Sequence, residues 1–216
     1  MREISARVAA DALSFAQRGW LLGTCGNLSV RLHSEQASAR PKDDLEMLMT
    51  ASGIDKSQLK EDDFLRIGKG LKLLQPGPHK PSSEGTVHEV VYSRTAAGAC
   101  YHVHSIWNNL ASRIFREQGM VCFEGIEMIK GLTGDSGRPF GLRDSVRLPI
   151  VDNHEDMLEL ARNVEAGLDP KVPAVLVYQH GVYAWGRDGS EARRHVEVIE
   201  FLLEYVCRLH QLSRQA

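Results

Sequence analysis

Two histidines separated by a single residue stand out in the segment Tyr101-His-Val-His104. If this segment is a β-strand, side chains two positions apart point to the same side, so His102 and His104 share a face. Two imidazoles placed in this way can bind one metal ion. Two histidines can also lie close in sequence without such a role, and the segment alone leaves both interpretations open.

A third histidine, His180, follows the apolar run Ala174–Gln179 and precedes a glycine. Such a run is typical of a strand that is buried on both faces, and binding sites gather at the sheet edge where such strands end. Three histidine ligands would leave one position open on a catalytic zinc ion. The position of His180 therefore favours the metal-site interpretation.

Two glutamates are further candidates, although the residues alone favour a structural role for both. Glu84 follows Pro81-Ser-Ser at the expected start of a helix, where a carboxylate is stabilised by the helix dipole by up to about 1 kcal/mol. The functional alternative makes Glu84 a fourth metal ligand or an acid/base. Glu127 has Lys130 three residues later, a spacing that is common on solvated helices.

Small polar turns form the last group of candidates. They are Gly26-Asn-Leu-Ser29, Thr50-Ala-Ser-Gly53 and Ser82-Ser83. Turns of this kind that converge at helix starts can bind a phosphate through backbone N–H groups and hydroxyls, without net positive charge. Each is only a turn when taken singly, and none matches the P-loop or the dinucleotide-binding fingerprint.

Alternating helices and strands must position these residues. Periodicity predicts helices over residues 3–18, 82–94, 106–115, 125–131, 155–168 and 190–212. Strands are predicted over residues 27–32, 45–50, 64–67, 97–104, 146–151 and 174–179. Ser82 or Ser83 is the predicted N-cap of the second helix. The alternation indicates the α/β class, a sheet covered by helices, in one domain.

Composition narrows the function classes. The 216 residues are 43% hydrophobic and carry a formal net charge of −2 with no basic block, so a globular core is expected and nucleic-acid binding is not supported. No apolar run approaches the roughly 20 residues of a membrane helix, and the first residues lack the pattern of a signal peptide. The four cysteines are scattered, which favours reduced thiols in a cytoplasmic protein.

Taken in order, these motifs resemble the class II aldolase/adducin family, from about residue 5 to about residue 210. The resemblance implies one three-layer α/β/α domain over residues 1–216, with a central sheet that is largely antiparallel or mixed. It also implies a homotetramer with active sites between neighbouring subunits and a sugar phosphate as substrate.

The same resemblance implies roles for individual residues. His102, His104 and His180 would hold one zinc ion per subunit, and Glu84 would lie beside it. The substrate phosphate would be bound by Asn27, Ser29, Thr50, Gly53, Ser82 and Ser83.

Two stretches, Glu127–Gly131 and His180–Gly186, are similar to a branch of the family that removes water from a 2-keto sugar phosphate, with Glu127 as acid/base. An aldolase or 4-epimerase acting on a fuculose- or ribulose-type phosphate is the alternative, because it uses the same enolate chemistry. A non-catalytic, adducin-like assembly module is expected to lack the histidines, and all three are present.

Overall fold

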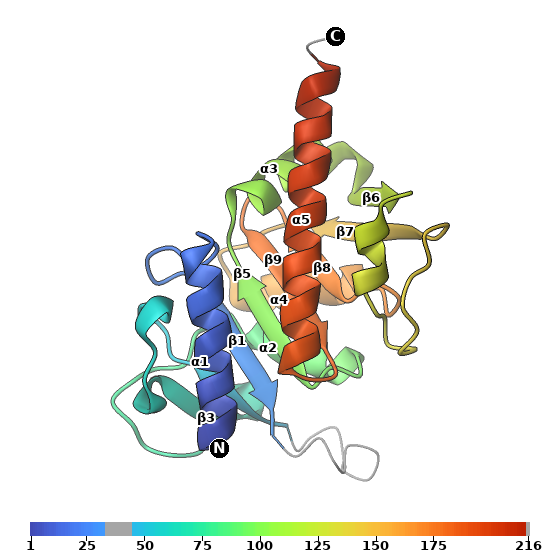
Figure 1. Cartoon of the computed structure of the whole chain (residues 1–216). Coiled ribbons are helices and arrows are strands. Elements are labelled where there is room, and N and C mark those ends of the chain that lie inside the picture. Colours follow the sequence, from blue (N-terminus) through green and yellow to red (C-terminus); the bar gives the residue numbers. More distant parts are fainter. Residues whose placement is uncertain (33–44, 215–216) are drawn as a thin grey trace.

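A single mixed sheet runs through the computed structural model, which describes residues 1–32 and 45–214 (Figure 1). The strand order is β4-β3-β2-β1-β5-β9-β8-β7-β6, and only β7 and β8 are parallel neighbours among the described pairs. The strands are β1 (Asn27–Arg31), β2 (Glu46–Thr50), β3 (Phe64–Gly68), β4 (Lys72–Leu73), β5 (Ala99–Val103), β6 (Met120–Glu124), β7 (Ser145–Val151), β8 (Ala174–Val177) and β9 (Gly181–Gly186).

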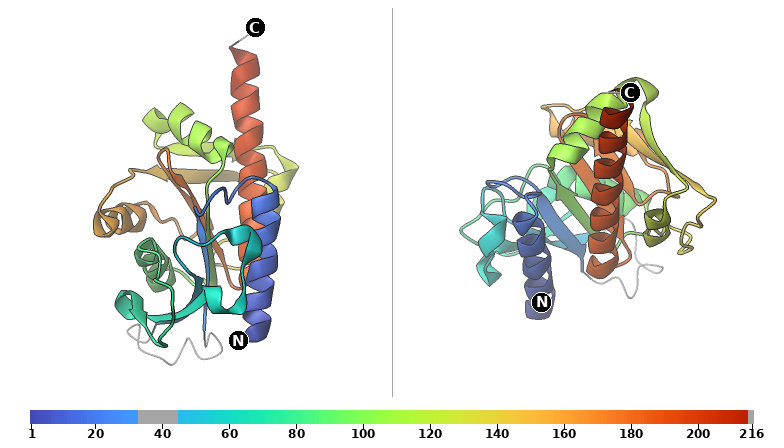
Figure 2. Two further views of the ribbon diagram at one scale, coloured as in Figure 1. Left: turned by 90° about the vertical axis from the view of Figure 1, so that its left-hand side faces the viewer. Right: turned by 45° about the horizontal axis from the view of Figure 1, so that its top comes forward.

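Helices cover both faces of the sheet, as Figure 2 shows. The α-helices are α1 (Arg2–Gln17), α2 (Gly85–Arg94), α3 (Ile106–Ile114), α4 (Met157–Gly167) and α5 (Gly189–Ser213). The short 3-10 helices are η2 (Lys56–Gln58), η3 (Glu61–Asp63), η4 (Lys69–Leu71), η5 (Arg116–Gln118) and η6 (Glu127–Gly131). The predicted α/β class with a mixed sheet is confirmed. Among the described helices, none has both the length and the apolar character that a bilayer crossing needs.

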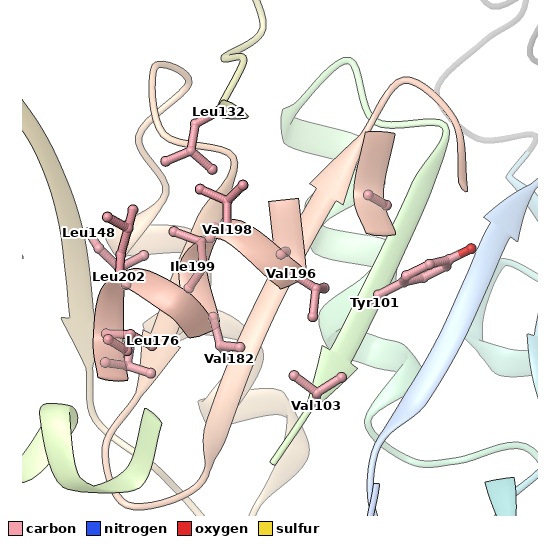
Figure 3. Close-up of a cluster of buried hydrophobic side chains, with 14 of the residues drawn as sticks. Tyr101, Val103, Leu132, Leu148, Leu176, Val182, Val196, Val198, Ile199 and Leu202 are labelled. Carbon is pink, nitrogen blue, oxygen red and sulfur yellow. The ribbon is translucent and has the colours of Figure 1, made fainter. Parts of the chain in front are cut away.

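Two apolar cores lie on the two sides of the sheet because strand residues alternate between them. On β5, Tyr101 and Val103 pack into the core beneath α1 and α5, and Figure 3 shows both with residues of α5 such as Val196. Cys100 faces the other core, beneath α2 and α4, and His102 points to that same side. The sheet therefore directs the chemistry-bearing residues of β5 towards α2.

Several predicted boundaries differ from the structure. The central strand β9 was not predicted, and neither were β4 and β6. The predicted serine N-cap of α2 is wrong, because Glu84 holds that position with no side-chain cap bond. The backbone N–H groups of Gly85 and Thr86 instead donate to the carbonyl oxygens of Ser82 and Ser83.

A buried histidine joins α5 to the sheet. His195 is fully buried; its Nδ1 donates to the carbonyl oxygen of Trp185 on β9 at 2.5 Å, and its Nε2 accepts from the backbone N–H of Thr133 at 3.1 Å. This arrangement requires a neutral ring with its proton on Nδ1. Burial lowers the pKa of His195 to about 4, from an ordinary value of 6.5.

This buried ring predicts a pH dependence of stability. The unfolded chain binds the second proton more readily than the folded one, so the free energy of unfolding falls as the pH drops from 6.5 towards about 4. We expect His195 to contribute roughly 2 to 3 kcal/mol to that fall. In urea denaturation, His195→Gln should show a shallower pH dependence over this window, whereas equal slopes for the two proteins would show that His195 is not held neutral.

Candidate metal centre

The His-Val-His segment lies at the end of β5, with both rings on one side. His102 is fully buried within the strand, and His104 follows the last strand residue, Val103. The Nε2 atoms of the two rings are 2.8 Å apart. The strand therefore places the two histidines together, as their spacing predicted.

Antiparallel pairing of β5 with β9 brings the third histidine to the other two. Val103 lies opposite Val182, so His180, immediately before β9, lies beside the end of β5. Its ring centroid is 5.0 Å from that of His102 and 4.8 Å from that of His104. The three rings thus come from two neighbouring strands that are distant in sequence.

Gly181 permits this close approach. A Cβ atom at this position would lie 2.5 Å from the carbonyl oxygen of Val103, 2.9 Å from Cε1 of His102 and 3.0 Å from Cδ2 of His104. The first of these contacts is with backbone, which cannot move aside without disturbing the strand pairing. Glycine is therefore required here by the close contact itself.

Glu84 completes the group from the N-terminus of α2. Its Oε1 is 3.0 Å from Nε2 of His180 and 3.7 Å from Nε2 of His102. Asn27 orients the carboxylate by donating from Nδ2 to the other oxygen, Oε2, at 2.5 Å. One donor atom from each of four residues lies within 4.8 Å of the others: Glu84, His102, His104 and His180.

Hydrogen bonds on the outer side of two rings determine which nitrogen faces the centre. Nδ1 of His102 lies 3.0 Å from the carbonyl oxygen of Val182, which can only accept, so Nδ1 carries the proton. Nδ1 of His180 lies 3.2 Å from the amide oxygen Oδ1 of Asn153, which also can only accept, so this Nδ1 carries a proton too. These outer contacts occupy Nδ1 of both rings and leave Nε2 facing the centre, the arrangement typical of metal-ligating histidines.

The charge states also suit a cation. Burial alone would raise the pKa of the Glu84 carboxyl, but His102 and His180 hold it well below its ordinary value, so it is an anion. Burial, together with His102 and His180, lowers the pKa of His104 to about 3 and keeps that ring neutral. Neutral imidazoles and an ionised carboxylate are the forms that coordinate metals. The donor set fits a divalent transition ion such as zinc.

A cavity of about 570 Å³ opens beside His104. Its lining is mainly apolar, and it includes Trp20, Leu22, Ile106, Trp107 and Leu110 together with Arg18 and Arg113. Leu22 and Ile106 are 65% and 71% exposed, which is unusual for large apolar side chains beside a polar centre. The metal centre therefore has an accessible side with an apolar surface.

Four of the six predicted phosphate-binding residues lie on segments that contact one another near Glu84: one begins β1 and the other three lie in the turn after β2 and in the segment before α2. They are Asn27, Gly53, Ser82 and Ser83. Nδ2 of Asn27 lies 3.5 Å from Oγ of Ser82. The backbone N–H of Ser52 donates to the carbonyl oxygen of Lys80 at 3.0 Å, which joins the second turn to the segment that precedes the third.

The other two, Ser29 and Thr50, are fully buried within the sheet. Oγ of Ser29 lies 2.7 Å from both Nδ1 of His88 and the hydroxyl of Tyr92. Oγ1 of Thr50 accepts from the backbone N–H of Leu28 at 3.1 Å. Their hydroxyls hold β1 in place, and the structure does not bring them to the exposed turns.

A buried lysine that the sequence did not single out lies behind these turns. Lys56 is 1% exposed, and its Nζ donates to the carbonyl oxygens of Thr24 at 3.2 Å and Ile54 at 2.7 Å. Burial lowers its pKa, while Cys25 and Glu84 act in the opposite direction. Lys56 therefore joins the segments that flank the first two turns and places a cation near the Glu84 carboxylate.

Glu127 is not brought to the metal centre within one chain. It begins η6, its side chain is 71% exposed, and it pairs with Nζ of Lys130 at 2.7 Å. The neighbouring Ile129 packs into the core beneath α5, on the opposite side of the sheet from α2 and Glu84. A role for Glu127 at this centre requires a second copy of the chain.

Sequence reasoning also missed Asn153, the partner of His180. The parallel pairing of β7 with β8 places Val151 opposite Val177, so the residues that follow both strands meet at one edge of the sheet. That rule would have pointed to Asn153 if the parallel pair had been predicted. Asparagine after a strand is otherwise an ordinary loop residue.

Comparisons with known proteins agree with this geometry. Residues 6–207 match the model of the class II aldolase and adducin N-terminal domain. Proteins named methylthioribulose-1-phosphate dehydratase are similar in sequence: that of Persephonella marina is 39% identical over 88% of this chain and 82% of its own length. The one from Geobacillus kaustophilus is 35% identical over 99% of this chain and 92% of its own length.

Among solved structures, the L-fuculose-1-phosphate aldolase of Thermus thermophilus aligns with a TM-score of 0.72 at 22% identity, covering 100% of this chain and 98% of that one. At such low identity this likeness bears on the fold alone. The family match extends over nearly the whole chain and includes every residue of the His/Glu group. The chain belongs to the class II aldolase and adducin family.

Proposed function

We propose that this chain removes water from 5-methylthioribulose 1-phosphate and forms 2,3-diketo-5-methylthiopentyl 1-phosphate, a step of methionine salvage. The observation that carries the proposal is the convergent group of three histidines and a glutamate. It lies in a chain whose relatives of 39% and 35% identity are named for this dehydration.

We assign zinc to the centre, with His102, His104 and His180 as its histidine ligands. Glu84 is best suited to be the fourth ligand, because a carboxyl whose pKa is held well below its ordinary value does not donate protons near neutral pH. When bound there, the cation polarises the C2 carbonyl of the substrate and stabilises the negative charge that develops on its oxygen.

Glu127 of a neighbouring subunit is the proposed proton carrier. Its carboxylate takes the proton from C3, and the electron pair of that C–H bond forms a double bond as the C4 hydroxyl leaves. The same carboxyl then gives its proton to the departing hydroxyl, which leaves as water. The remaining enol ketonises to the 2,3-diketone. The exposure of Glu127 and its place across the sheet support delivery between subunits, in a homotetramer.

The substrate has a charged phosphate at one end and an apolar methylthio group at the other. The metal centre likewise has polar turns on one side and an apolar cavity on the other. Asn27, Gly53, Ser82 and Ser83 offer donors for the phosphate, with the Lys56 cation behind the turns. The apolar cavity beside His104 suits the methylthio group. This polarity supports the methylthio sugar over an ordinary pentulose phosphate.

Turnover is the direct test of the reaction. Incubation with methylthioribulose 1-phosphate should release the diketone, a chelator should abolish its formation, and added zinc should restore it. Ribulose 1-phosphate, which lacks the methylthio group, should show a higher KM. Release of dihydroxyacetone phosphate in place of the diketone would establish an aldolase instead.

The close contact at Gly181 predicts a loss of metal affinity in Gly181→Ala. Its Cβ would displace His102 and His104, and we expect metal affinity to fall by about tenfold or more. Competition with a chelator measures this directly. Gly77→Ala is the matched control, since a Cβ there meets nothing within 4 Å. Equal affinities in the two variants would show that the centre does not use this part of the sheet.

Delivery of Glu127 between subunits predicts complementation. Glu127→Gln should lower kcat by about 10²–10⁴-fold while retaining metal, and His104→Ala should lose the metal. Co-expression of the two inactive chains should restore about one quarter of wild-type activity, because half of the subunits supply each intact part at random. Absence of any restored activity would place Glu127 and the histidines in one subunit or remove Glu127 from the reaction.

A further inference from the structure

One carboxamide in the first turn of α3 joins the backbone on both sides of the metal centre. Nδ2 of Asn109 donates to the carbonyl oxygen of Ser105 at 2.9 Å and to that of His180 at 3.0 Å, and it lies 3.0 Å from Oδ1 of Asn108. Ser105 directly follows His104. A single side chain therefore connects the segments that carry two of the histidines.

A second contact from α3 fixes the turn before β9. The backbone N–H of Gln179 donates to Oγ of Ser112 at 2.9 Å, and that hydroxyl donates to the carbonyl oxygen of Asn109 at 2.8 Å. Gln179 has a φ of +47°, in the left-handed region that non-glycine residues enter when their surroundings hold them there. The turn is thus held through its backbone, and the ring of His180 remains free to face Glu84.

The first turn of α3 is itself anchored to α5. Glu200 is 1% exposed and accepts from Oγ of Ser105 at 2.5 Å and from Nδ2 of Asn108 at 2.8 Å. Ser105 is also the N-cap of α3, because its Oγ accepts from the backbone N–H of Asn108. A continuous set of hydrogen bonds therefore runs from α5 through α3 to the segments of His104 and His180.

We propose that Asn109 is a positioning residue that fixes the separation of His104 and His180 before an ion binds, with Glu200 anchoring the turn that carries it. None of these residues coordinates the ion, so they act on its affinity through the backbone. The inference rests on the metal centre proposed above, but not on the identity of the substrate.

Metal affinity of the metal-free protein tests this inference without any assay of turnover. Asn109→Asp keeps the shape of the side chain but replaces the donor with an oxygen that faces two carbonyl oxygens. We expect it to bind Co²⁺ about tenfold to a hundredfold more weakly in competition with a chelator, with an altered visible absorption spectrum. Glu200→Gln should show a smaller loss in the same direction.

The matched control is Thr95→Val, at the opposite end of α2 from Glu84. It removes the hydrogen bond that the Thr95 hydroxyl donates to the carbonyl oxygen of Val91 at 2.8 Å and the one it accepts from the backbone N–H of Ala97 at 3.2 Å, and it should leave Co²⁺ binding unchanged. If Asn109→Asp does not fold, Ser112→Ala removes the contact to Gln179 and should weaken Co²⁺ binding. Wild-type affinity and spectrum in the folded Asn109→Asp, or in Ser112→Ala where only that variant folds, would overturn the inference. Failure of the wild-type protein to bind Co²⁺ would overturn the metal centre itself, and this inference with it.

Discussion

The antiparallel pairing of β5 with β9 is the constraint on which the rest of the site depends. It sets two histidines of one strand against a third that precedes the other, and Gly181 lets the backbones come close enough for the rings to share a centre. A shift of register by one residue would turn His102 away from α2 and into the core beneath α5. The neighbouring helices then act on this pairing: α2 supplies Glu84, and α3 holds the turn before β9.

Holding the Glu84 carboxylate and the three imidazoles together before an ion binds has an electrostatic cost. A partly buried carboxylate among partly or fully buried imidazoles is unfavourable unless each polar atom has a partner. Here, Asn27 holds one oxygen of Glu84, Val182 and Asn153 contact Nδ1 of two rings, and one donor atom of each of the four residues lies within 4.8 Å of the others. An ion coordinated by these four atoms satisfies the whole group at once. The geometry is therefore fixed by groups outside the coordinating atoms, as is usual for metal centres in proteins.

The sequence was most informative where periodicity is strong. Long amphipathic segments gave α1 and α5, and the i, i+2 spacing gave the shared face of His102 and His104. It failed at β9, because Gly181–Gly186 shows no alternation and, with a glycine at each end, lacks the continuous apolar run that predicted β8. The roles of Asn109, Asn153 and Lys56 could not be predicted from the sequence, for another reason. Their roles depend on contacts between segments far apart in the chain, and as residue types they are ordinary in helices and loops.

The tight turn between β8 and β9 has a consequence for how the protein folds. Val177 pairs with Gly181, so His180 belongs to a local hairpin whose loop closes at a small entropic cost. His102 meets Val182 only across 80 residues of chain, and such non-local pairing forms more slowly. The hairpin alone offers one ligand. A nascent chain therefore holds none of the other proposed ligands beside His180 until the long-range pairing is made, so the proposed metal site is assembled late in folding.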